Sequence, residues 1–186
     1  MEDRIERGFR RHKLALRMIS HRARRRTICN FTGLTRERIK TIRREWHVSS
    51  KDCRRGPSPT SLIVFFRSPR IRSEASVIAF FCRILGAVPN EKIPNAARYY
   101  PTLERGERLC EAYEAFSTYF PDTKVNFELI VLLAISLAEP HALELKSCRN
   151  CRKAIITLDE QRSRFMCEQC DKPSFQGLRR TALSKT

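Results

Sequence analysis

Apolar residues recur at helical spacing through the middle of the chain. They are Val77, Ile78, Phe81 and Leu85 in the segment 74–85, and Leu109, Tyr113, Phe116 and Phe120 in a second segment. A third segment, 125–138, is almost continuously apolar and predicts a central helix that ends before Pro140. The pattern therefore predicts a mainly α-helical fold with a compact helical middle region. We expect the aromatic residues of this region to be core residues, namely Phe80, Phe81, Tyr99, Tyr100, Phe116 and Phe120.

A break precedes the middle region. Gly56, Pro57 and Pro59 interrupt the segment 54–61 and predict a linker or a turn. The apolar run that follows, LIVFF at 62–66, is expected to be either a buried extended piece or a strand at an interface. This run and FELIVLLAISLA are more apolar than a small domain requires, so two interpretations stay open. Either both belong to the core, or one forms an obligate interface with a partner.

The segment 24–44, RRRTICNFTGLTRERIKTIRR, has the spacing of a helix-turn-helix. Gly33 supplies the turn, and Cys29 is small enough to lie where two helices cross closely. Thr35 is placed to cap the second helix, with Glu37 favourable in its first turn. The residues expected to pack the two helices together are Ile28, Leu34, Ile39 and Ile42.

The second helix of this motif has a basic face opposite its apolar stripe. The stripe is Ile39, Ile42 and Trp46, and steps of about 100° per residue place the polar side chains opposite it or on its flanks. The residues expected nearest to DNA base edges are Arg36, Lys40, Thr41 and Arg44. Those expected on phosphates are Arg38, Arg43 and the run Arg24, Arg25 and Arg26. The alternative is an ordinary helical hairpin with a solvated basic face.

The distribution of charge favours a nucleic-acid partner. The 186 residues include 37 Lys and Arg against 20 Asp and Glu, which gives a formal charge of +17. Residues 1–56 carry 18 basic and 6 acidic side chains and residues 148–186 carry 9 and 4, whereas the part between them is neutral. Clustered cations favour a polyanion, because each phosphate that they neutralise releases condensed counterions.

Two cysteine pairs provide the strongest signal in the sequence. Their spacing, C-x2-C-x15-C-x2-C, is typical of a zinc site with four thiolate ligands. The cysteines are Cys148, Cys151, Cys167 and Cys170. Four thiolates leave no coordination position for a substrate, so we expect one structural Zn²⁺, with a redox-active pair or unligated thiols as alternatives.

The residues between the two cysteine pairs are expected to form a hairpin. Its strands would be residues 154–158 and 164–166. Metal knuckles often have Gly directly after the second cysteine of a pair, where this chain has Arg152 and Asp171.

Together these features resemble the family of the bacterial flagellar transcriptional activator FlhC. The resemblance rests chiefly on the four cysteines, with weaker support from LTRERIKTIRREW at 34–46, RGPSP at 55–59 and EASVIAFFCRIL at 74–85. It implies a zinc-containing subunit that assembles with a small helical partner, FlhD, binds double-stranded DNA upstream of promoters and recruits RNA polymerase. FlhC-like activators also occur on mobile elements, so the genes that it controls are expected to be flagellar or conjugative-transfer genes.

The sequence thus predicts three regions: a basic helical region with the helix-turn-helix (1–56), a connector with the helical, partner-binding core (57–144), and a zinc-ribbon-like module with a basic tail (145–186). A structural, zinc-containing RNA-binding protein of ribosomal type is the alternative, since small basic proteins with four-cysteine sites are common in that class. The two differ in that an RNA-binding protein would recognise shape and tolerate single changes at Lys40 or Arg44.

We expect neither enzyme activity nor a small-molecule substrate. The chain has no P-loop, G-x-S-x-G or H-E-x-x-H motif, and its four histidines, His12, His21, His47 and His141, are isolated in the sequence. No apolar run reaches the roughly 18 residues that a membrane span needs, and no export signal is readable. We therefore expect a cytoplasmic bacterial protein that is associated with the nucleoid when bound to DNA and has no membrane partner.

Overall fold

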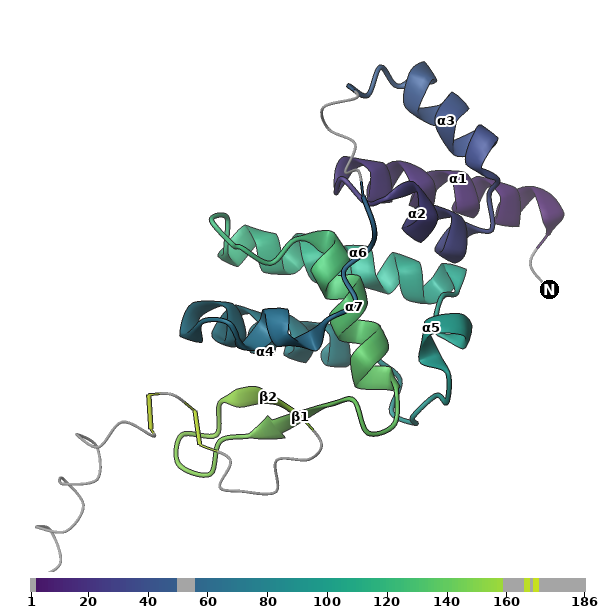
Figure 1. The fold of residues 1–186 in the computed structure, drawn as a ribbon. Coiled ribbons are helices and arrows are strands. Elements are labelled where there is room, and N and C mark those ends of the chain that lie inside the picture. Colours follow the sequence, from purple (N-terminus) through teal and green to yellow (C-terminus); the bar gives the residue numbers. More distant parts are fainter. Residues whose placement is uncertain (1–2, 50–55, 159–165, 168, 171–186) are drawn as a thin grey trace, which may run out of the picture.

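The computed structural model of the protein describes residues 3–49, 56–158, 166–167 and 169–170. In this part the chain forms seven α-helices, a short 3₁₀ helix and a two-stranded antiparallel sheet. In chain order the elements are α1 (Arg4–Ser20), α2 (Arg25–Thr32), α3 (Arg36–Glu45), η2 (Leu62–Phe66), α4 (Pro69–Ile84), α5 (Ala96–Tyr99), α6 (Leu103–Tyr119), α7 (Phe127–Ala138), β1 (Leu143–Ser147) and β2 (Ala154–Leu158). The mainly helical fold expected from the sequence is confirmed, and Figure 1 shows the helices stacked above the β1–β2 hairpin.

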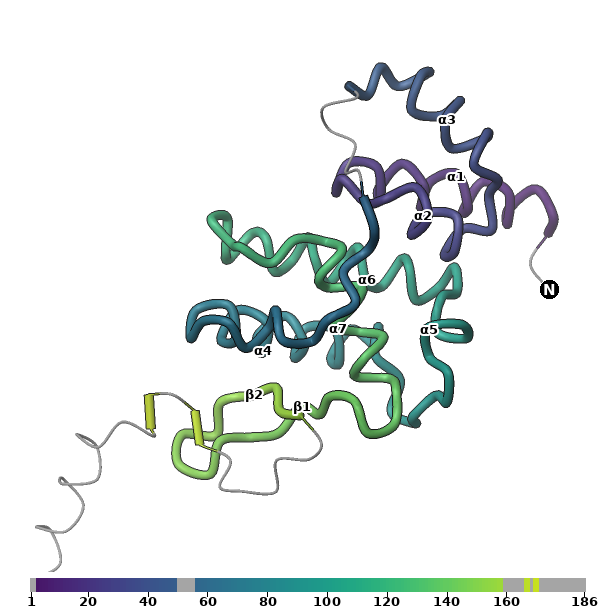
Figure 2. Tube along the Cα trace, in the orientation of Figure 1, coloured from purple at the N-terminus to yellow at the C-terminus, as the bar shows by residue number. Residues whose placement is uncertain are grey.

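Helix α6 lies at the centre of the helical body. Helices α1 and α2 pack against it from one side and α4 from the other, as the tube view shows (Figure 2). Arg10 of α1 donates to Glu107 of α6 at 3.0 Å. Seven residues further along both helices, Arg17 donates to Glu114 at 3.1 Å. The equal offset of the two ion pairs means that α1 and α6 run parallel.

One hydrophobic cluster connects the helices, from Leu14 of α1 to Ile156 of β2. The described parts of the regions 1–56 and 57–144 therefore share a single core. At Gly106 of α6 a Cβ atom would lie 2.8 Å from Cδ2 of Leu14, so the absence of a side chain lets α1 and α6 approach closely.

Helix α7 is the central helix predicted from the apolar run. It begins at Phe127 and ends at Ala138, two residues before Pro140, and most of its residues are buried. The run FELIVLLAISLA is therefore covered by the chain's own core. None of the helices in the described part of the chain is long and apolar enough to cross a membrane.

Two buried carboxylates connect elements that are far apart in the sequence. Glu128 of α7 is 3% exposed and accepts hydrogen bonds from the backbone N–H of Arg24 at 2.7 Å and from the hydroxyl of Thr27 at 3.0 Å. Because the first N–H groups of a helix have no partner within it, Glu128 caps α2 from outside. Glu74 of α4 similarly accepts from the hydroxyl of Thr123 at 2.8 Å. These contacts hold the start of α2 and the loop before α7 in place through tertiary structure.

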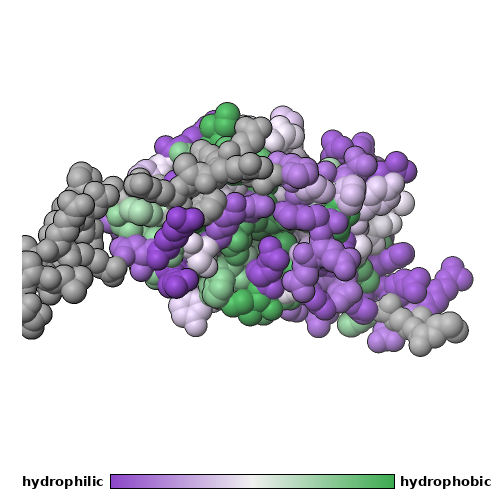
Figure 3. Space-filling model, turned by 90° about the horizontal axis from the view of Figure 1, so that it is seen from below, coloured by the Kyte–Doolittle hydropathy of each residue, from purple (hydrophilic) through white to green (hydrophobic). Residues whose placement is uncertain are grey.

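The expectation that all six middle-region aromatic residues are core residues is wrong for two of them. Phe80 is 48% exposed and Tyr99 is 55% exposed, whereas Tyr100 and Phe116 are fully buried. Each exposed ring is adjacent in sequence to a more buried one, and a step of about 100° around a helix turns the neighbour toward solvent. The face seen from below in Figure 3 likewise shows apolar residues among polar ones.

The run at 62–66 is neither an extended piece nor a strand. It forms the 3₁₀ helix η2, in which Phe65 alone is fully buried and Ile63 is 68% exposed. An extended segment needs a neighbouring strand for its backbone groups. The two strands in the described part of the chain pair with each other, and neither pairs with this run.

Candidate metal centre and basic helical surface

Helices α2 and α3 are joined by a three-residue turn. Helix α2 ends at Thr32 and is capped by Gly33, whose φ of 67° is left-handed and whose N–H donates to the carbonyl oxygen of Cys29 at 2.9 Å. The hydroxyl of Thr35 accepts from the N–H of Arg38 at 3.3 Å and so caps α3, as predicted. Of the residues expected to pack the two helices together, Ile28, Ile39 and Ile42 are fully buried, and Leu34 is partly buried.

Helix α3 buries one face and exposes basic side chains on the rest of its surface. The exposed basic residues are Arg36, Arg38, Lys40 and Arg44, and the two carboxylates of the helix, Glu37 and Glu45, are exposed as well. Thr41 is half-buried, and its hydroxyl donates to the carbonyl oxygen of Glu37 at 3.1 Å. Trp46 does not belong to the buried stripe, since it is 61% exposed. Trp46 keeps the helical phase, because its N–H donates to the carbonyl oxygen of Ile42 at 3.0 Å, but the helix ends at Glu45 and the described chain does not cover the indole ring.

Two of the arginines expected on phosphates instead contact the protein itself. The guanidinium of Arg24 is largely buried and lies 3.8 Å from the carboxylate of Glu128. Arg43 donates to the carbonyl oxygen of Ala23 at 2.9 Å and so fastens α3 to the loop before α2. Both side chains are engaged in holding the two helices, whereas those of Arg25 and Arg26 are exposed.

The four cysteines of the predicted pairs converge on one point. Their Sγ atoms all lie within 4.8 Å of one another, and those of Cys151 and Cys167 are 3.5 Å apart. In a regular tetrahedron with zinc–sulfur bonds of about 2.3 Å, the sulfur atoms are about 3.8 Å apart. The cluster could therefore hold a metal ion such as zinc, with four protein ligands and no open position. Cys148 and Cys170 are buried, and Cys151 is exposed.

Backbone groups around the cluster favour a thiolate. The N–H of Cys167 lies 3.3 Å from Sγ of Cys148. Burial raises the pKa of the Cys148 thiol, but N–H groups including those of Cys151 and Cys167 outweigh it and lower the pKa to about 6. Arg152 takes a left-handed φ of 63° at the position where metal knuckles often have Gly. Asp171, its counterpart after the second pair, lies outside the described residues.

One strand of the expected hairpin lies in the described part of the chain. Strand β2 matches the predicted strand 154–158, but it pairs with β1, in a register that puts Ser147 opposite Ala154. The first cysteine pair therefore lies in the turn of a hairpin, with a strand on each side. The expected partner, 164–166, falls mostly outside the described residues, and Met166 lies in no strand.

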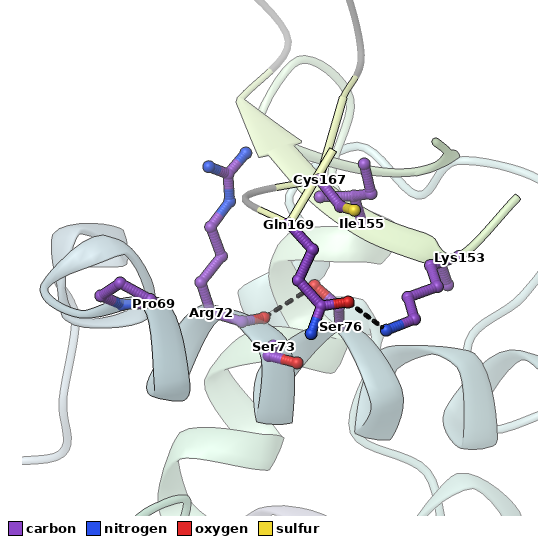
Figure 4. Close-up of a pocket in the computed structure, with 9 residues that line it drawn as sticks. Pro69, Arg72, Ser73, Ser76, Lys153, Ile155, Cys167 and Gln169 are labelled. Atoms are coloured by element: carbon purple, nitrogen blue, oxygen red, sulfur yellow. Dashed lines mark hydrogen bonds between the residues drawn. The ribbon is translucent and has the colours of Figure 1, made fainter. Parts of the chain in front are cut away.

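The module is attached to the helical body through α4. The N–H of Ile156 donates to the hydroxyl oxygen of Ser76 at 3.1 Å. Between α4 and the cysteines lies a cleft of about 390 Å³, and Figure 4 shows Cys167 at its wall. There the ammonium group of Lys153 donates to the side-chain oxygen of Gln169 at 2.7 Å. Lys153 follows the first cysteine pair and Gln169 lies within the second, so this bond ties the two together.

No protein-family model matches the chain, and a comparison with curated proteins finds no significant match. The geometry of the chain itself must therefore support any functional proposal. Sequence reasoning missed three residues near α2 and α3: Glu128, which caps α2, and Arg7 and Arg11, which lie beside the turn at Gly33. A carboxylate inside the most apolar helix was the available signal for Glu128. The available signal for the arginines was their position on the helix: Arg7, Arg11 and Leu14 follow one another at intervals of four and three residues and so share one face.

Proposed function

We propose that the protein is a zinc-stabilised, DNA-binding subunit of a bacterial transcription activator, similar to FlhC. The observation that carries the proposal is the division of α3, which buries Ile39 and Ile42 and exposes four cations. A basic helix that is held by its apolar face against other helices presents its charges on a rigid support. Such a support is what a base-reading helix requires.

In this proposal α2 and α3 act as a helix-turn-helix, with α3 in the major groove. A ten-residue helix is about 15 Å long and, with side chains, 10–12 Å wide, which fits a groove about 12 Å wide. Arg36, Lys40 and Arg44 are spaced at four-residue intervals and so lie along one side of α3, within reach of base edges. Thr41 is placed next to them. Arg25, Arg26 and Arg38 contact phosphates, whereas Arg24 and Arg43 hold the motif together.

The four cysteines would bind one zinc ion with a structural role. The ion would supply the cross-link that a module with few buried apolar residues needs in order to fold, since the second hydrophobic cluster contains little besides the cysteines and Ile155. No catalytic step forms part of the proposal. By its resemblance to FlhC, the subunit would assemble with an FlhD-like helical partner and contact RNA polymerase at flagellar or conjugative-transfer promoters.

A genome-wide crosslinking map of the tagged, full-length protein in its own host tests this function. The neighbouring genes stay intact so that any partner subunit is present. We expect sharp peaks upstream of promoters, and the genes behind them identify the regulon. Signal on RNA after nuclease controls would contradict the proposal and favour the ribosomal-type alternative.

Substitutions in α3 then test the mode of binding at a peak sequence. Lys40→Ala and Arg44→Ala should each reduce the preference for that sequence over a scrambled duplex, by roughly 1–3 kcal/mol for a base contact. Arg38→Ala should weaken binding to both duplexes alike, since a phosphate contact carries no sequence information. Lys124→Ala is the matched control, because Lys124 is exposed and lies in the loop between α6 and α7, outside the α2–α3 unit.

A further inference from the structure

A cleft of about 810 Å³ lies beside the turn between α2 and α3. It is bordered by the N-terminal half of α1, the end of α2 and the start of α6. Four of its lining residues are arginines, three from α1 and one from α6. They are Arg7, Arg10, Arg11 and Arg105.

The arginines of α1 lie on the same helix face as the core. Arg7, Arg11, Leu14 and Met18 follow one another at intervals of three or four residues. Leu14 and Met18 are buried against the helical body, whereas Arg7 is exposed and Arg11 is half-exposed. The face of α1 thus changes from apolar to cationic at the point where it extends beyond the packed core. A helix end that is simply solvated would not need its arginines on the same face as the buried residues Leu14 and Met18.

The charges of the cleft are not all equally available to a ligand. Arg10 is held by Glu107 at 3.0 Å, and Arg105 donates to the carbonyl oxygen of Tyr100 at 3.0 Å. The carboxylate at the rim, Glu104, is paired with Arg108.

Arg11 differs from these residues, because it makes no hydrogen bond or ion pair within the described part of the chain. Its guanidinium lies next to the turn, where a Cβ atom at Gly33 would be 3.8 Å from Nη2 of Arg11. The cleft therefore presents the guanidinium of Arg11, which its own carboxylate does not neutralise.

We propose that this arginine cleft holds the phosphate backbone of the duplex that α3 reads. The inference rests on the proposed function. Helix α3 begins at Arg36, three residues after Gly33, so a phosphate strand that borders the groove occupied by α3 passes the turn and reaches Arg11. Arginine suits this role because its planar guanidinium donates two parallel hydrogen bonds to one phosphate. The cleft adds backbone contacts and thereby fixes the register of α3 without reading bases.

The test measures binding of the full-length, zinc-loaded protein to a fluorescent 30-bp mixed-sequence duplex at several salt concentrations. Arg7→Gln and Arg11→Gln should each reduce the slope of log K against log salt by about 0.9. That change corresponds to an affinity loss of about eightfold at 0.1 M salt. Arg83→Gln, which removes an equal charge from α4 on the other side of α6, should change neither quantity. Unchanged thermal unfolding of each variant shows that the fold is intact.

The outcomes separate the cleft from the proposed function. If Arg38→Ala weakens duplex binding and both cleft variants bind like the wild type, the cleft assignment falls and the proposed function stands. If the duplex binds to none of the proteins, both fall. Titration with pyrophosphate identifies a free phosphate ligand: cleft variants that lose pyrophosphate binding but keep duplex binding overturn the inference. Cleft variants that lose binding to double-stranded RNA but keep binding to duplex DNA overturn the inference as well.

Discussion

Glu128 offers the sharpest test of how the α2–α3 unit is held on the core. Its carboxylate, 3% exposed, accepts from the backbone of Arg24 and from the hydroxyl of Thr27. Nε and Nη1 of Arg24 are also buried and have no hydrogen-bond partner in the described structure. The carboxylate 3.8 Å from Nη1 is thus the group that compensates this buried cation.

The loss of stability expected on substitution of Glu128 follows from these contacts. Hydrogen bonds to a charged acceptor contribute about 1.5–3 kcal/mol each, and removing one partner of a buried ion pair costs about 3–5 kcal/mol. Glu128→Ala removes both bonds and the charge, so we expect the free energy of unfolding to fall by about 3–5 kcal/mol. Glu128→Gln keeps one acceptor oxygen and the side-chain volume, and should cost about half as much. Against a typical total of about 5–15 kcal/mol, either loss is measurable.

Urea unfolding followed by far-UV circular dichroism measures the change. Glu111→Gln is the matched control. Glu111 is an exposed α6 residue whose carboxylate makes a weak ion pair with Arg17 at 4.0 Å, so its substitution should change the free energy of unfolding by no more than about 0.5 kcal/mol. A double-mutant cycle of Glu128→Gln with Thr27→Val should give a coupling energy above about 0.5 kcal/mol. A cost below about 1 kcal/mol for Glu128→Ala would refute the cap, and equal costs for Ala and Gln would assign the whole effect to charge.

Three further predictions concern other parts of the fold. Gly106→Ala should lower stability by about 1–2 kcal/mol in thermal unfolding despite the helix preference of Ala, since its Cβ meets Leu14; a raised midpoint would contradict the close approach. Cys167→Ser should reduce zinc from one equivalent to near zero by elemental analysis, yet keep the helical dichroism, because the cysteine cluster is separate from the main core; retained stoichiometric zinc contradicts the four-ligand site. Burial lowers the pKa of His21 although Glu114 opposes the shift, so the unfolded state binds the proton first and stability should fall as pH drops below about 6.5; His21→Gln should flatten unfolding curves measured between pH 7 and 5.5, and an unchanged pH dependence refutes this.

The features that were predictable depend on neighbouring residues alone. The end of α2 at Gly33 and the cap of α3 at Thr35 follow from local backbone preferences, and α7 follows from an apolar run that stops before Pro140. The convergence of the cysteines follows from their spacing, because a two-residue gap lets both sulfur atoms of a pair face one metal ion. Each signal lies within a few residues, so its energy hardly depends on distant parts of the chain.

Partners from distant parts of the chain were not predictable. Arg24 is one of three consecutive arginines with the same local sequence character, yet it lies against Glu128, more than a hundred residues away. Strand β2 pairs with β1, a partner that the sequence analysis did not name, across the turn that holds the first cysteine pair. Phe80 and Phe81 are the same residue type, so hydrophobicity alone could not tell them apart. The packing of α4 decides that Phe80 faces solvent.

Sequence by itself thus determined the helical class, the capped turn between two helices, the cationic ends and the four-cysteine site. Tertiary structure decided which cations remain outside, which carboxylates are buried as caps, and that Arg7 and Arg11 border a cleft beside the turn. The physical reason is that hydrogen bonding and helical period act over a few residues, whereas the burial of a charge depends on what the rest of the chain packs against it.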